Sequence, residues 1–253
     1  NLNTLRSNLN AAPKRMANGQ SQNIISIPNA DGNLERFRVF ENTTMEAELA
    51  AKYPEIKSYV GIGIDNPLAT AYFSVSPLGF KSMVLSPDKS AEFIEPISTD
   101  LTTYTVYRRA DKRQSLNQFE CSVVDNAVAS SPTMMLRNAN DSTLRTFRLA
   151  VSCTGEYATY FGGTKALALA AINASMTRVN GIFEKDFAVR MVLIANNDLV
   201  IYTNASTDPY TTSYNSQLQS TLTSVIGDAN YDVGHVFVRA SNNGNAGCIG
   251  CVC

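Results

Sequence analysis

The chain contains a single histidine, His235, among its 253 residues. A zinc site with two or more histidine ligands cannot be built from one histidine, and any triad of serine, histidine and aspartate would have to use His235. A lone histidine beside Val236 and Phe237 on an expected strand is typical of a core or sheet residue. The sequence therefore argues against a histidine-based catalytic centre made by these residues alone.

Long apolar runs and an excess of one charge are also missing. No apolar run approaches the roughly 18 residues of a membrane span, and the formal net charge is −1. This balance gives no case for nucleic acid or an anionic membrane as a partner. With 44% hydrophobic and 17% charged residues, the chain can bury a core. Its length suits one large domain or two ordinary ones.

Five cysteines are present, and their odd number leaves one thiol free or paired outside the chain. Four are disulfide candidates: Cys153, Cys248, Cys251 and Cys253. Zinc binding by the three terminal cysteines would need Cys153 as a fourth ligand. A redox pair normally opens a helix, whereas Gly250 and Val252 indicate an extended segment, so structural disulfides are favoured. Their presence suits an oxidising, extracytoplasmic setting.

The clearest pattern lies in residues 163–194. Apolar side chains recur in steps of three and four at Leu169, Ile172, Met176, Val179 and Phe183. This spacing predicts a helix that ends near 184–186, with Thr164 as its cap. Strands are expected at 146–152, 187–194 and 231–238, and a second amphipathic helix at 214–226, capped by Ser213 or Thr212. The alternation of strands and helices favours a largely parallel sheet with crossover helices.

The preceding residues predict a β-rich, antiparallel region. Strands are expected at 24–27, 34–40, 58–64, 69–75, 82–86, 91–97 and 102–108. A short helix with Thr44 as its cap is expected over 43–52, and residues 1–22 are expected to form a linker or a lightly docked arm. A weakly hydrophobic connector over 125–142 places a domain boundary near residue 140. The fold class is therefore a β-rich domain (1–140) followed by an α/β domain (141–253).

Four stretches of the second domain carry a family resemblance: residues 149–158, 176–191, 196–199 and 231–237. They resemble the reprolysin-type metzincins, and more narrowly the secreted zinc metalloproteinases of Bacteroidetes-type bacteria. The first domain resembles the propeptide of the same precursors. The resemblance implies a zymogen that hydrolyses peptide bonds, with protein or peptide substrates, and a location outside the bacterial cell or on its surface. Zinc is the implied cofactor, and calcium is a further candidate.

The chain departs from that family at the zinc motif. The family binds zinc through H-E-x-x-H-x-x-G-x-x-H on a helix, and its glutamate deprotonates the metal-bound water. This chain has one histidine, so no catalytic residue is carried over, and the chain alone is expected to be inactive. The resemblance places the zinc helix after Cys253, in a C-terminal remainder of the precursor, so the chain is expected to be a truncated or processed product.

The resemblance still assigns roles to a few positions. Gly247, Cys248 and Ile249 match the edge strand that aligns an extended substrate. Cys253 matches a cysteine whose partner lies downstream. Cys121 has two interpretations: a buried small hydrophobe, or a thiolate that keeps the enzyme latent by binding a zinc held outside this chain.

Activation is expected to require a cut near Arg137 or Arg145 in the connector. Two alternatives to a protease precursor remain at this point. One is a non-catalytic secreted binding or adhesion module, which the missing zinc motif and the β-rich first half support. The other is an inhibitory propeptide fragment.

Overall fold

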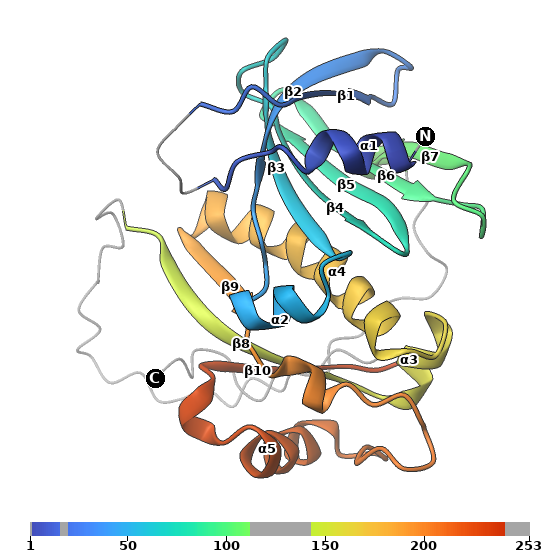
Figure 1. Cartoon of the computed structure of the whole chain (residues 1–253), viewed down its shortest axis with the longest axis vertical. Coiled ribbons are helices and arrows are strands. Elements are labelled where there is room, and N and C mark those ends of the chain that lie inside the picture. The colour runs from blue at the N-terminus through green and yellow to red at the C-terminus, as the bar shows by residue number, and fades with distance from the viewer. Residues whose placement is uncertain (1, 16–19, 112–142, 241–253) are drawn as a thin grey trace.

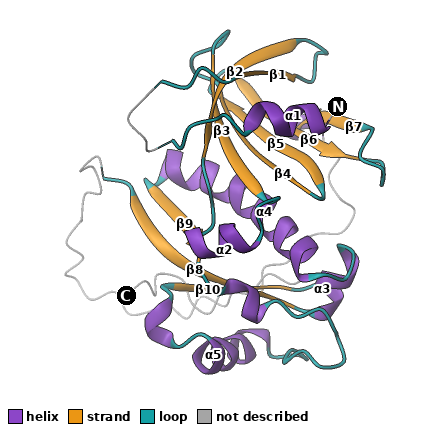
Figure 2. Cartoon of the chain, in the orientation of Figure 1, coloured by secondary structure: helices purple, strands orange, loops and turns teal. Residues whose placement is uncertain are grey.

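The computed structural model describes residues 2–15, 20–111 and 143–240. We call residues 2–111 the first half and residues 143–240 the second half. Figure 1 shows four layers, in which a seven-stranded sheet covers helix α4 (Lys165–Asp186), a three-stranded sheet follows, and helix α5 (Tyr214–Val225) lies on the far side. Figure 2 shows the corresponding division between a strand-rich first half and a second half of alternating strands and helices.

The first half is built on an antiparallel meander, with each strand paired to the next along the chain. Its strands are β1 (Ile24–Pro28), β2 (Leu34–Glu41), β3 (Lys57–Gly63), β4 (Thr70–Ser76), β5 (Gly79–Ser86), β6 (Lys89–Pro96) and β7 (Tyr104–Arg108), followed by the short helix η1 (Arg109–Asp111). Alternate side chains fill its apolar interior, where Phe37, Val39 and Phe73 are at most 1% exposed. The predicted antiparallel region is confirmed.

The prediction of a linker or arm over residues 1–22 was wrong at its start. Helix α1 spans Leu2–Leu9, with Leu9 buried and Leu2 and Leu5 packed against the interior of the first sheet. Arg6 fixes it further by donating from Nη2 to the Ser76 carbonyl at 2.7 Å. Leucines at positions 2, 5 and 9 have helical spacing, but a window this short gives little periodicity to detect.

The second half contains the predicted parallel sheet, in the order β10-β8-β9. Its elements are β8 (Arg145–Cys153), α3 (Gly155–Tyr160), α4 (Lys165–Asp186), β9 (Val189–Leu193), η2 (Asn197–Val200), α5 (Tyr214–Val225), η3 (Asp228–Asn230) and β10 (Val233–Phe237). Side chains of the central strand β8 alternate between two cores. Leu149 and Val151 contribute to the core that contains α4, whereas Ala150 contributes to the core that contains α5.

Helix α4 matches its prediction closely. The Thr164 hydroxyl accepts a hydrogen bond from the Leu167 N–H at 3.2 Å, as expected of an N-cap. Leu169, Ile172 and Met176 are at most 5% exposed and face the second half's main core. At the other end, Lys165–Asp186 is followed by Phe187, which is 61% exposed, so the strand predicted from 187 begins only at Val189.

The helix predicted over 43–52 starts later and without Thr44 as its cap. Helix α2 spans Ala47–Lys52, and its N-cap is Glu46, in an extended conformation. Thr44 is buried instead, and residues 44–46 run parallel to β9 through a bridge between Met45 and Leu193. Pairing with a sheet edge satisfies these backbone groups, which outweighs the local capping preference of threonine. In the described residues, no helix is long and apolar enough to cross a membrane.

Candidate functional site

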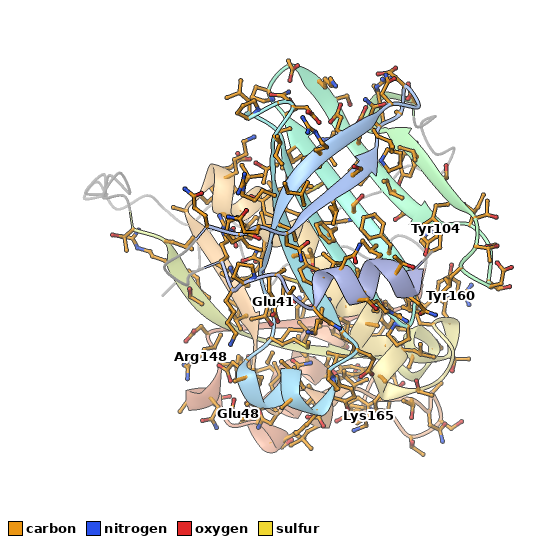
Figure 3. The ribbon with its side chains drawn as sticks, turned by 45° about the horizontal axis from the view of Figure 1, so that its top comes forward. Glu41, Glu48, Tyr104, Arg148, Tyr160 and Lys165 are labelled. Carbon is orange, nitrogen blue, oxygen red and sulfur yellow. The ribbon has the colours of Figure 1, made fainter. Side chains whose placement is uncertain are left out.

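A ligand site in the second half is expected at the carboxyl edge of the parallel sheet. In parallel α/β sheets, ligands generally bind outside the carboxyl ends of the strands. Here Cys153 ends β8, and its register partner Phe237 ends β10. Figure 3 labels Tyr160 of α3, which follows β8 at this edge and stacks under the Arg239 guanidinium at 4.4 Å from the ring centroid.

Cys153 is a free thiol in the structure, although the sequence made it a disulfide candidate. The residue is 0% exposed, because a backbone bridge to Ile201 covers it and its Sγ lies 3.8 Å from the Tyr202 carbonyl oxygen. Burial raises the pKa of the Cys153 thiol to about 12. A thiol held neutral and covered is neither a nucleophile nor a metal ligand.

We therefore expect Cys153 to resist alkylation while the protein is folded. At pH 8 the raised pKa lowers its thiolate fraction about a thousandfold relative to an ordinary cysteine, before any loss of access is counted. Iodoacetamide labelling followed by peptide mass mapping would measure this, with the same protein in denaturant as the control. Equal labelling rates at Cys153 in both states would contradict the buried position.

Other polar groups at this edge hold the strand end in place. Tyr210 donates from its hydroxyl to Ser152 Oγ at 2.6 Å, and Ser152 Oγ donates to the Val200 carbonyl at 2.6 Å. Burial raises the pKa of the Tyr210 phenol to about 12. Both hydroxyls are thus occupied within the fold, and neither has an adjacent base to activate it.

The turn from β8 into α3 is equally well satisfied. The Thr154 hydroxyl accepts from the Tyr157 N–H at 3.3 Å, and the Gly155 N–H donates to Asp208 Oδ2 at 2.7 Å. Glycine is required at 155 because a Cβ there would lie 2.0 Å from the Ala205 nitrogen. The edge of the sheet is therefore a rigid scaffold, in which each of these polar groups serves the fold.

Asn197 is a structural residue that sequence reasoning missed. Its side chain is 0% exposed and pairs with both backbone groups of Val151, accepting from N–H at 2.7 Å and donating to C=O at 3.0 Å. The Asn197 side chain thereby pairs with β8 as the backbone of one further β9 residue would. In the sequence, residues 196–199 contributed only to the family resemblance. No local pattern distinguishes Asn197 from the adjacent Asn196.

Zinc does not fit the side chains that the structure describes. They contain no group of three or more His, Cys, Asp or Glu residues that could hold a metal ion. His235 lies on β10, where its ring makes an edge contact with Phe237 at 4.9 Å between centroids. This position on a strand agrees with the prediction of a core or sheet residue, and we assign His235 no catalytic role.

Most of the predicted site residues lie outside the described parts of the chain. They are the edge-strand residues Gly247, Cys248 and Ile249, the latency candidate Cys121, and the disulfide candidates Cys251 and Cys253. Their proposed roles stay predictions. The boundary near residue 140 likewise falls in the gap between residues 111 and 143.

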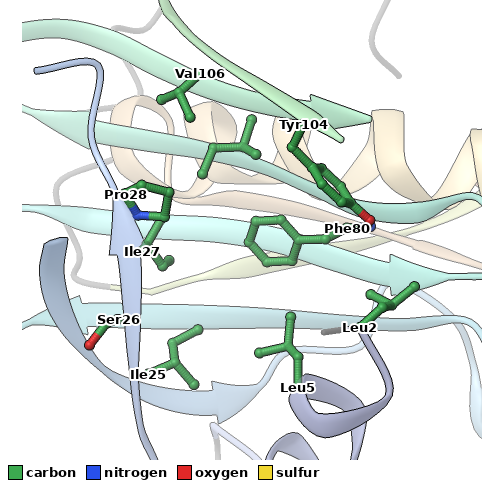
Figure 4. A pocket seen from close by; sticks show the side chains of 10 residues that line it. Leu2, Leu5, Ile25, Ser26, Ile27, Pro28, Phe80, Tyr104 and Val106 are labelled. Atoms are coloured by element: carbon green, nitrogen blue, oxygen red, sulfur yellow. The ribbon is translucent and has the colours of Figure 1, made fainter. Parts of the chain in front are cut away.

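A pocket of about 350 Å³ opens in the first half, between α1 and the curled sheet. Figure 4 shows Phe80, Tyr104 and the leucines of α1 facing the same space beside residues 25–28 of β1. The lining is Leu2, Leu5, Ile25, Ser26, Ile27, Pro28, Phe80, Ile94, Tyr104 and Val106. Apart from the hydroxyls of Ser26 and Tyr104 it is apolar, so it can hold an apolar group but offers no acid–base pair.

Comparison with known families gives one finding. Residues 143–253 match the family described as metallo-peptidase family M12B, reprolysin-like. The match begins two residues before β8 and includes every element of the second half. This part of the chain is therefore similar to the reprolysin-like metallopeptidases. No match to the chain was found among curated proteins.

Proposed function

We propose that the chain is part of the precursor of a secreted zinc metalloendopeptidase. The second half is the first part of its catalytic domain, and the first half is its propeptide. The family match over residues 143–253 carries the proposal, and it includes every described element of the α/β region built around β8. Members of this family are generally zinc-dependent.

The zinc ligands of this peptidase come from outside these 253 residues. The family motif needs three histidines, the chain has one, and the described side chains offer no metal cluster. The residues described here would then supply the sheet and the α4 scaffold on which a zinc helix is placed. In this proposal, Cys121 is a latency ligand to that zinc, and residues 247–249 align the substrate.

Hydrolysis of a denatured protein such as casein tests the proposal. Once its connector is cut and its first half is removed, the precursor should hydrolyse casein, lose activity with a zinc chelator, and regain it when zinc is restored. The 253-residue chain should show no hydrolysis under the same conditions. A cut precursor without chelator-sensitive hydrolysis would contradict the proposal and favour the alternative of a binding or adhesion module.

A further inference from the structure

The outer edge of β9 is covered by the first half. Strand β8 lies between β10 and β9, so β9 would otherwise present an open edge. The Leu193 N–H donates to the Thr44 carbonyl at 2.8 Å, and the Glu46 N–H donates to the Leu193 carbonyl at 2.9 Å. Residues 44–46 therefore add a short fourth strand to the second half's sheet, by the strand addition that peptide-binding domains use.

The Glu46 side chain extends the same contact. Its Oε2 accepts a hydrogen bond from the Ala195 N–H at 2.7 Å, just beyond the end of β9. At the other end of β9, the Arg190 guanidinium donates to the Asn42 side chain and to the Thr43 carbonyl. Five consecutive residues, 42–46, thus contact the second half through hydrogen bonds or backbone pairing.

Burial of apolar side chains accompanies this pairing. Met45, Leu49 and Ile56 of the first half are at most 2% exposed and belong to the same core cluster as Ile172 and Leu193 of the second half. Burying side chains of this size removes apolar surface from water and so stabilises the contact between the halves. The two halves therefore share a hydrophobic core rather than touching at a wet surface.

The face of α4 that meets the first sheet is more polar. Asn173 accepts hydrogen bonds from the hydroxyls of Thr44 and Ser58, and Arg178 pairs with Glu95 at 2.8 Å. Three buried polar atoms at this face, Ser82 Oγ, Asn173 Nδ2 and Arg178 Nε, have no hydrogen-bond partner among the described residues. Water can hydrogen-bond to these polar side chains of α4 when the first half is absent. A polar face of this kind is typical of an interface between parts that associate reversibly.

We infer that the first half is a docked partner of the second half and stays bound to it when the connector is cut. The contacts above join the halves independently of residues 112–142. The docking surface is the β9 edge together with α4, and within the described residues no strand of the first half pairs with β10. A single cut in the connector would then leave β9 covered, and uncovering it would require a separate dissociation step. This inference concerns the contact between the halves and holds whether or not the protein is a peptidase.

The test uses the full chain with a site for a sequence-specific protease placed within residues 112–142. After complete cutting, both fragments should elute together in size-exclusion chromatography at micromolar protein concentration. They should separate in denaturant. Elution of two separate folded fragments under native conditions would overturn the inference.

A pair of variants at Glu46 tests whether strand addition holds the halves together. Glu46 has φ −61°, which proline accepts, so Glu46→Pro removes the N–H donor and the carboxylate with little backbone strain. Glu46→Ala removes the carboxylate alone and is the matched control. We expect Glu46→Pro to weaken association of the cut fragments about tenfold more than Glu46→Ala does. Equal effects of the two variants would contradict the role of the backbone pairing.

Hydrogen exchange provides a second measurement that does not depend on the variants folding. The amide protons of Glu46 and Leu193 should keep their protection after the connector of the wild-type chain is cut. Loss of protection at both positions on cutting would show that the fourth strand leaves β9, and would overturn the inference.

Discussion

Replacing Arg190 with alanine should lower the free energy of unfolding by about 3–5 kcal/mol, the usual cost of breaking a buried ion pair. Arg190 is 9% exposed, and its Nη1 lies 3.2 Å from Glu184 Oε1, whose side chain is 4% exposed. Its removal leaves Arg15 as the remaining cationic partner of Glu184 and takes the donors away from Asn42 and Thr43. Urea denaturation followed by circular dichroism would measure the loss.

The exposed pair of Arg36 and Asp65 provides the control. Its Nη2 to Oδ1 distance of 2.6 Å is shorter than that of the buried pair, but both side chains face water. Water and salt screen such a pair, so Arg36→Ala should change stability far less than Arg190→Ala. Similar losses for the two variants would mean that Arg190 is not buried against the first half.

Replacing Asn197 with leucine should cost about 2–6 kcal/mol, since it leaves two buried backbone groups without partners at about 1–3 kcal/mol each. Leucine branches at Cγ as asparagine does, but it cannot hydrogen-bond the N–H and C=O of Val151. The loss falls on the central strand β8, which packs on both cores of the second half. Thermal and urea unfolding would both report it.

Asn196→Leu is the matched control for this prediction. Asn196 is the adjacent asparagine, is only partly buried, and makes no side-chain capping bond to η2. Its replacement should leave stability nearly unchanged. A comparable loss at both positions would indicate a general intolerance of the loop to leucine rather than the specific pairing of Asn197.

The elements that could be predicted from sequence are those with enough residues to show a period. In α4, an apolar stripe over Leu169 to Phe183 and a threonine cap gave both the helix and its buried face. In the first half, β1 alternates between exposed and buried residues, whereas β4 is buried on both faces along most of its length. Short elements were missed or misplaced. Helix α1 was not predicted, because three leucines in eight residues give too short a period to detect. Helix α2 was predicted to begin too early, near Thr44, because the capping preference of threonine was the only local signal.

The contacts that join the two halves could not be predicted, because their partners are far apart in the chain. Glu46 bonds to Ala195, and Arg190 to Asn42 and Thr43, across nearly 150 residues. A single sequence carries no signal for such pairs, and polar residues in a β-rich region look like surface positions. The family resemblance located the second half correctly, and residues 143–253 match that family. It placed the catalytic ligands outside the chain.

The zinc content of the complete precursor, measured by elemental mass spectrometry after exhaustive dialysis, tests the proposed function most directly. The account predicts about one zinc ion per precursor molecule and no bound zinc in the 253-residue chain, whose single histidine cannot form the family's site. A precursor without bound zinc would contradict the assignment to a zinc metalloendopeptidase. Stoichiometric zinc in the 253-residue chain would instead place the metal site within these residues.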